Sequence, residues 1–237
     1  MSPLIDAHRG ECGAPGLSAA ERYSRAVSMG VDYVEIDVRR TSDGVYINYH
    51  DDRTASGRDV SALTLSALKQ ELGAQLLTVD EAIELVDSKV GLHVDLKDGG
   101  QELEVVQYIE ARCAHSQVVY TTGGDAAVRA IKEQVPHARA GLSLGEDLEG
   151  APPWDAVRVR LSELFPGQRL RRSRADFTAV HKRLAEVRVL EFCARKHIPA
   201  WVWTVDDEEE IARFMRDPRV TVLITDRPDI ALRFRKA

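Results

Sequence analysis

Short apolar runs recur along this chain of 237 residues, and segments with the period of a helix lie between most of them. The runs are rich in β-branched residues and have the length of strands. Because strands and helices alternate, the pattern predicts parallel βαβ units. Nine runs are expected to be strands: Leu4–Arg9, Tyr33–Arg40, Val45–His50, Gly91–Lys97, Gln117–Thr121, Ala138–Leu144, Asp176–Leu184, Pro199–Val205 and Thr221–Thr225.

Helix-start signals follow several of these runs. A serine or threonine at the N-cap with glutamate three residues later forms a capping box, and acidic residues in the first turn complement the helix dipole. These signals predict helices over Ser18–Met29, Thr64–Leu72, Thr78–Val86 and Asp206–Met215. We expect Gly145–Arg174 to hold one helix flanked by loops.

One connection between strands has no helix. Tyr33–Arg40 runs into Val45–His50 through a turn that contains Asp43-Gly44, and Asp-Gly is a strong signal for a two-residue hairpin. If Asp43 and Gly44 are the central pair, facing residues have numbers that sum to 87. Asp37 then faces His50 on the same side of the hairpin.

Eight βα repeats remain when the hairpin arm is set aside. This number and the chain length match a (β/α)₈ TIM barrel, whose usual size is about 250 residues. We therefore expect an α/β fold in which residues 1–237 form a single barrel domain, with a β-hairpin arm after the second strand.

Composition excludes several classes of protein. With 44% hydrophobic and 30% charged residues the chain is expected to be globular, and a net charge of −6 argues against nucleic-acid binding. No apolar run approaches the ~20 residues of a membrane helix, so we expect no membrane anchor. Three scattered cysteines and the absence of a signal peptide favour a cytoplasmic location. The sequence carries no signal for a particular oligomeric state.

Candidate chemistry gathers where the expected strands end, which in a barrel is the mouth that carries catalytic groups. Glu35 and Asp37 are two residues apart on one strand, as are Asp95 and Lys97 on another, so each pair shares a face. His93 is expected to be a hydrogen-bonded interior residue. The other ionisable residues at strand ends are His8, Arg9, His50, Asp206 and Asp226.

Three converging carboxylates without cysteine favour a hard cation such as Mg²⁺ or Ca²⁺. Such an ion reverses the local charge, so an anionic substrate is compatible with an acidic chain. A nearby lysine could bind an anionic oxygen, and two histidines can serve as general base and general acid. This combination suits phosphoryl transfer.

The ordered set of motifs resembles the glycerophosphodiester phosphodiesterase family of the phospholipase C-like superfamily. The resemblance implies a barrel that cleaves small phosphodiesters with one divalent cation. It assigns acid–base roles to His8 and His50, metal ligation to Glu35, Asp37 and Asp95, phosphate contacts to Arg9 and Lys97, and a pocket wall to Trp203. The motifs are Ala7-His8-Arg9-Gly10, Val34-Glu35-Ile36-Asp37-Val38, Thr41-Ser42-Asp43-Gly44, His50-Asp51, Asp95-Leu96-Lys97, Trp203-Thr204-Val205 and Ile224-Thr225-Asp226-Arg227-Pro228.

Two positions depart from the family pattern. Gly16 stands where the family usually has the glutamate of a Pro-Glu-Asn-Thr stretch, and Glu11 in the same loop is expected to stay exposed. Asp95 stands where glutamate is more common, and Asp-x-Lys resembles the sphingomyelinase D branch. Three readings follow: a metal-dependent enzyme that cleaves a glycerophosphodiester-like or sugar phosphodiester, a cyclising phosphodiesterase with a cyclic phosphate product, and a non-catalytic barrel that binds a phosphorylated ligand.

Overall fold

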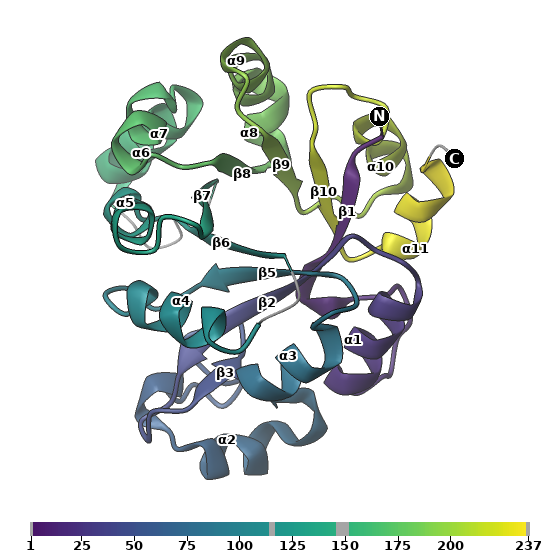
Figure 1. Cartoon of the computed structure of the whole chain (residues 1–237), viewed down its shortest axis with the longest axis vertical. Helices are drawn as coiled ribbons and strands as arrows, with labels where there is room; N and C mark the ends of the chain where they lie inside the picture. The colour runs from purple at the N-terminus through teal and green to yellow at the C-terminus, as the bar shows by residue number, and fades with distance from the viewer. Residues whose placement is uncertain (1, 114–116, 146–151, 236–237) are drawn as a thin grey trace.

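Eight parallel strands form a closed barrel with helices around it (Figure 1). The computed structural model describes residues 2–113, 117–145 and 152–235. The barrel strands are β1 (Leu4–Ala7), β2 (Tyr33–Arg40), β5 (Gly91–Leu96), β6 (Val118–Thr122), β7 (Arg139–Leu144), β8 (Phe177–His181), β9 (Ala200–Trp203) and β10 (Val222–Thr225).

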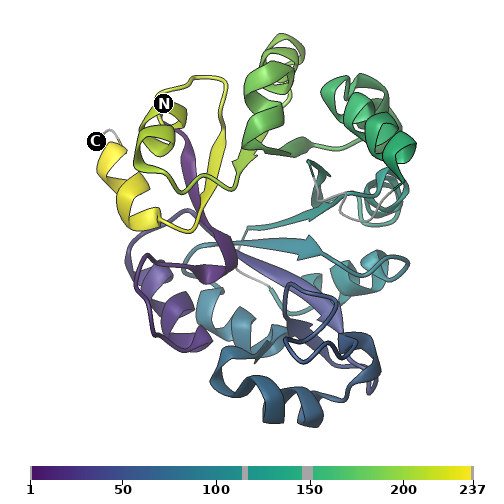
Figure 2. The same cartoon turned by 180° about the vertical axis from the view of Figure 1, so that it is seen from behind.

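Strand β1 closes the barrel because it pairs with β10 on one side and with β2 on the other. Ala7 is the register partner of Thr225 in β10 and of Val34 in β2. The first and last strands of the barrel therefore lie side by side, as both views show (Figures 1 and 2). The expected (β/α)₈ barrel is confirmed.

The helices surround the barrel, and three of them begin at the predicted caps Ser18, Thr64 and Thr78. The helix expected from Asp206 has Asp207 as its N-cap. Ser18 and Thr78 each form a complete capping box with the glutamate three residues later. The α-helices are α1 (Ala19–Ser28), α2 (Leu65–Leu72), α3 (Val79–Val86), α4 (Glu102–Glu110), α5 (Asp125–Gln134), α6 (Pro153–Leu164), α7 (Gly167–Ser173), α8 (Lys182–Leu184), α9 (Leu190–Lys196), α10 (Glu208–Phe214) and α11 (Pro228–Ala231). Short irregular helices are η1 (His8–Gly10), η2 (Val60–Ala62), η3 (Gly73–Gln75), η4 (Ala185–Val189) and η5 (Leu232–Phe234).

The expectation of one helix within Gly145–Arg174 is wrong, since the described part of this segment holds both α6 and α7. Pro166 separates them, because proline has no amide proton to continue a helix. Residues 146–151 lie outside the described part of the chain.

The hairpin arm forms after β2, but its predicted register is wrong by one residue. Val38 faces Asn48 and Arg40 faces Tyr46 in β3 (Tyr46–Asn48), so facing residues sum to 86. The Thr41 amide donates to the Val45 carbonyl at 3.0 Å, which leaves a three-residue loop. Gly44, with φ +83°, takes the left-handed position that such loops require. Strand β3 also pairs with β4 (Leu77–Thr78).

Aromatic rings fill the end of the barrel away from the mouth. Trp201 is 1% exposed, stacks on Phe177 at 4.6 Å between ring centroids, and lies 5.0 Å from the Tyr33 ring. Gly141 makes room for this packing, because a Cβ there would lie 2.4 Å from the Phe177 ring. The polar residues of the mouth therefore rest on a rigid apolar base.

Candidate active site

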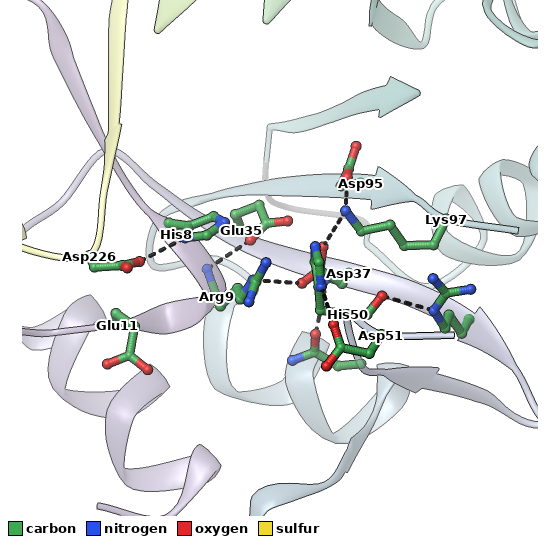
Figure 3. Close-up of polar contacts among 12 residues, drawn as sticks. His8, Arg9, Glu11, Glu35, Asp37, His50, Asp51, Asp95, Lys97 and Asp226 are labelled. Carbon is green, nitrogen blue, oxygen red and sulfur yellow. Dashed lines mark hydrogen bonds and ion pairs between the residues drawn. The ribbon is translucent and has the colours of Figure 1, made fainter. Parts of the chain in front are cut away.

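Two neighbouring strands bring three carboxylates together at the mouth (Figure 3). Glu35 and Asp37 project from β2, and Asp95 is the register partner of Asp37 on β5. One oxygen from each lies within 4.8 Å of the others. Glu35 and Asp37 are buried, so water cannot fully solvate their carboxylates.

Two cationic side chains contact this cluster. The Lys97 ammonium lies 2.5 Å from Asp95 and 3.0 Å from Asp37. The Arg9 guanidinium lies 3.2 Å from the other oxygen of Asp37, and the Arg9 amide donates to Glu35 at 2.7 Å. Asp37 is therefore flanked by two positive charges, and Glu35 is held by a backbone donor.

The pKa values reflect this crowding. Burial, and next the charges of Asp37 and Asp95, raise the pKa of Glu35 well above its usual value. Burial also opposes the charged form of Asp95, but the adjacent Lys97 outweighs it and lowers the pKa of Asp95. For Lys97, burial is outweighed by Asp95 and Asp37, so the lysine pKa is raised and its charge is retained. The raised pKa of Glu35 shows that the carboxylates repel one another, and a divalent cation between them would relieve this repulsion.

The donor set itself selects the kind of ion. Carboxylate oxygens are hard ligands that Mg²⁺ and Ca²⁺ prefer, and among the described residues no sulfur or imidazole joins this group. The residues present therefore fit a hard divalent cation.

His8 reaches the mouth from a tight turn at the end of β1. Arg9 and Gly10 in this turn have positive φ values of 51° and 65°. Gly10 packs directly on Tyr23, since a Cβ at Gly10 would lie 2.5 Å from that ring. His8 Nδ1 lies 2.7 Å from Asp226, beyond β10. The turn thus directs the His8 ring towards Asp226. It also directs the Arg9 side chain towards Asp37 and the Arg9 amide towards Glu35.

His50 reaches the same mouth from the hairpin arm. It follows β3, its Nδ1 lies 2.7 Å from Asp51, and its carbonyl accepts from Arg39 Nε at 2.9 Å. Burial lowers the pKa of His50 below its ordinary value. Asp37 does not face His50 in the ladder as predicted, because the Asp37 carbonyl accepts instead from the Tyr49 amide at 2.9 Å.

A cavity of about 920 Å³ is lined by all eight residues to which the family resemblance assigns a role, whereas Asp206 and Asp226 do not line it. Trp203 at the end of β9 forms part of its wall, with its ring edge-on to His181 at 5.2 Å between centroids. The predicted residues that line this cavity are His8, Arg9, Glu35, Asp37, His50, Asp95, Lys97 and Trp203.

Glu11 and Gly16 lie apart from the carboxylate cluster. Glu11 pairs with Arg22 at 3.1 Å and points away from the three carboxylates (Figure 3). Gly16 is exposed, and a Cβ added there would meet nothing within 4 Å. Neither residue adds a ligand to the three described above.

The model of the glycerophosphoryl diester phosphodiesterase family matches residues 8–134, which include all the candidate ligands and both histidines. The chain belongs to this family. It is therefore a phosphoric diester hydrolase, of a family whose members generally bind a divalent cation. Within the part of this family member that the structure describes, none of the helices has both the length and the hydropathy that a membrane span requires.

Relatives match this phosphodiesterase over nearly its whole length. A glycerophosphodiester phosphodiesterase of Caldanaerobacter subterraneus subsp. tengcongensis is 26% identical over 250 residues, which cover 97% of this chain and 96% of the relative. Together with the family match it supports glycerophosphodiester phosphodiesterase activity.

Solved structures share the fold. A putative glycerophosphoryl diester phosphodiesterase of Agrobacterium tumefaciens has a TM-score of 0.79 at 18% identity, with 98% of this chain and 97% of that chain covered. An Oleispira antarctica phosphodiesterase, solved in complex with the product sn-glycerol-3-phosphate, has a TM-score of 0.78 at 20% identity and covers 98% of this chain and 96% of its own.

Three residues at the site of this phosphodiesterase received no role from the sequence. Asp226 contacts His8, Asp51 contacts His50, and Thr121 donates to Asp95 at 2.6 Å. Asp51 and Asp226 lie within the motifs quoted above, so their position was a usable signal. Thr121 has no such signal, because its contact depends on the register between β5 and β6.

Proposed function

We propose that this phosphodiesterase hydrolyses glycerophosphodiester-like substrates with one divalent cation, Mg²⁺ or Ca²⁺, held by Glu35, Asp37 and Asp95. The observation that carries the proposal is the cluster of three carboxylates beside Lys97 within a single cavity. A cation bound there would supply positive charge to the non-bridging oxygens of the phosphate. In this proposal residues 1–237 act as one domain.

Arg9 and Lys97 would hold the substrate phosphate in this scheme. Their charged groups already lie at the rim of the carboxylate cluster, and the Arg9 side chain is 40% exposed and thus open to the cavity. The raised pKa of Lys97 keeps it cationic throughout the neutral range. Both residues would stabilise the charge that grows on phosphate oxygens in the transition state.

His8 and His50 would move the two protons of the reaction. Each presents Nδ1 to a carboxylate, and a donor hydrogen bond from Nδ1–H leaves Nε2 free for proton transfer. One neutral imidazole would take a proton from the attacking water, while the other, protonated, would give a proton to the leaving alcohol oxygen. One P–O bond forms and one breaks, and the total number of protons is conserved.

The substrate is proposed to be a small diester of glycerol phosphate or of a sugar phosphate. A cavity of about 920 Å³ has room for a headgroup-sized molecule, and Trp203 offers an apolar wall beside the charged cluster. The Oleispira antarctica relative, which binds sn-glycerol-3-phosphate, supports a glycerol-containing substrate.

Phosphorus NMR of product mixtures tests the proposal. We expect glycerophosphocholine or glycerophosphoethanolamine to give a phosphomonoester with Mg²⁺ or Ca²⁺, and no product with excess EDTA. His8→Ala and His50→Ala should lose turnover, while His137→Ala, on a side chain 72% exposed, should retain it.

Each other result has a defined meaning. Undiminished turnover in EDTA would contradict the metal site. A cyclic phosphate as the final product would show that a hydroxyl of the substrate, and not water, attacks the phosphorus, and would contradict hydrolysis. Binding of phosphorylated ligands without turnover of any diester in the panel would indicate a non-catalytic barrel.

A further inference from the structure

A chain of hydrogen bonds runs through the barrel interior below the carboxylate cluster. Asp6 on β1, His93 on β5 and Thr121 on β6 are 0%, 3% and 2% exposed. His93 Nδ1 lies 2.6 Å from Asp6, and His93 Nε2 lies 2.8 Å from the Thr121 hydroxyl. The Thr121 hydroxyl donates in turn to Asp95 Oδ1 at 2.6 Å. The chain therefore ends on one of the proposed metal ligands.

The contacts of Thr121 show how this chain of hydrogen bonds reaches Asp95. The Thr121 hydroxyl donates its single proton to Asp95 Oδ1, so its oxygen is left to accept from His93 Nε2. His93 Nδ1 lies against the Asp6 carboxylate. Both ring nitrogens of His93 therefore have a partner inside the barrel, and the ring is fixed in place.

Stability alone gives little reason for these buried polar groups in this place. The His93 ring packs edge-on against Trp201 at 5.2 Å between centroids, beside a cluster of apolar side chains. Apolar residues of similar volume are often as stabilising as buried polar groups, because polar groups must first lose their hydration. The hydrogen bonds from Asp6 to Thr121 are better explained by what they do to Asp95.

We propose that Asp6, His93 and Thr121 are positioning residues that fix the orientation of the Asp95 carboxylate for cation binding. This inference rests on the proposed metal site. Thr121 holds Oδ1, which leaves Oδ2 on the side of Lys97 and the cavity. Without Thr121 the carboxylate of Asp95 could rotate about its last bond and follow the Lys97 ammonium alone.

Each proposed ligand then has its own protein donor. The Arg9 amide holds Glu35, and the Arg9 and Lys97 side chains flank Asp37. Asp95 contacts Lys97 through Oδ2, and among the described residues the Thr121 hydroxyl is the hydrogen-bond partner of its second oxygen, Oδ1. Loss of a group that orients a metal ligand typically costs 10–100-fold in metal affinity.

Calorimetric titration of the full chain with Mg²⁺ and with Ca²⁺ tests the inference. Thr121→Val keeps the shape of the side chain and removes its hydroxyl, so we expect at least about tenfold weaker cation binding. Thr121→Ser restores the hydroxyl and should bind within about twofold of wild type. Thr178→Val is the matched control, because Thr178 is also fully buried on a barrel strand and donates to the Leu142 carbonyl at 2.9 Å, away from Asp95.

The outcomes separate the two proposals. If the wild type binds neither cation, the metal site itself is wrong. If the wild type binds and Thr121→Val binds equally well, or Thr178→Val weakens binding as much, the positioning role is wrong. His93→Asn provides a second variant, since asparagine is too short to span Asp6 and Thr121. It should weaken cation binding as Thr121→Val does, and unchanged affinity in a folded His93→Asn protein would likewise overturn the inference.

Discussion

His8 Nδ1 lies 2.7 Å from the Asp226 carboxylate, and this contact joins the first and last strands of the barrel. Asp226 is itself held, because its backbone amide donates to Asp206 at 2.8 Å. The carboxylate therefore has a fixed place from which to orient the imidazole. Such a partner selects the tautomer that leaves Nε2 available to a substrate.

Removal of the Asp226 carboxylate should slow the reaction more than it weakens substrate binding. We expect Asp226→Ala to lower kcat by about 10²-fold, part of the 10²–10⁴-fold that general acid–base catalysis provides, with a small change in KM. Steady-state kinetics with a soluble diester measures this. Asp217→Ala, which removes a surface partner of Arg219, is the control and should keep its kcat. Equal kcat values for the two variants would contradict a role for Asp226.

The pKa of His50 should be lower than that of an ordinary histidine. Burial disfavours the imidazolium, so the pKa lies below 6.5 and the ring is mostly neutral at pH 6.5. His50 should therefore stay neutral, and able to accept a proton, at pH values low enough to charge an exposed histidine. NMR titration of the ring protons measures the midpoint, with His50→Gln to assign the resonance. A midpoint at or above 6.5 would show that the nearby carboxylates outweigh burial.

Catalytic activity should require Lys97 in its charged form. We expect Lys97→Met to lower kcat/KM by about 10²–10³-fold, the usual cost of removing a group that stabilises transition-state charge. The raised pKa of Lys97 also implies that its deprotonation does not limit activity in the neutral range. Lys89→Met is the control, since Lys89 caps surface carbonyls near α3. Near-normal kcat/KM in Lys97→Met would remove this residue from the phosphate site.

Gly10 should be far less tolerant of substitution than Gly16, although both have positive φ values of 65° and 78°. Alanine at Gly16 meets no neighbour and should cost about 1 kcal/mol for the backbone alone. Alanine at Gly10 would also overlap the Tyr23 ring, which adds about 1–3 kcal/mol. Urea unfolding of the two variants isolates the steric contribution as the difference between their free energies of unfolding. Equal losses would show that Tyr23 moves aside freely.

Local patterns predicted most of the elements, because their causes are local. Ser18 and Thr78 carry their capping partners within the same turn, and the barrel strands alternate with helices. The hairpin register depended on whether Asp43-Gly44 forms a two-residue turn or lies in a three-residue loop. Both kinds of loop can be built from these residues. The hydrogen bond from the Thr41 amide to the Val45 carbonyl shows that the three-residue loop forms.

The candidate site was predictable to the extent that strand ends are predictable. Glu35, Asp37 and Asp95 converge because parallel strands end at one mouth, and His50 arrives there in spite of the error in register. The contact from His93 to Asp6 spans 87 residues and depends on how the barrel closes. No local pattern contains that information.

Barrel closure has a consequence for the newly made chain. The family match ends at residue 134, yet His8 contacts Asp226, which is synthesised 218 residues later. Until β10 has emerged from the ribosome, β1 lacks one neighbour and His8 lacks its carboxylate. A chain stalled or cut before β10 would hold the proposed cation ligands and both histidines without the strand that closes the barrel beside them. Synthesis of β10 is therefore the step that closes this barrel and brings the partner of His8 to the mouth.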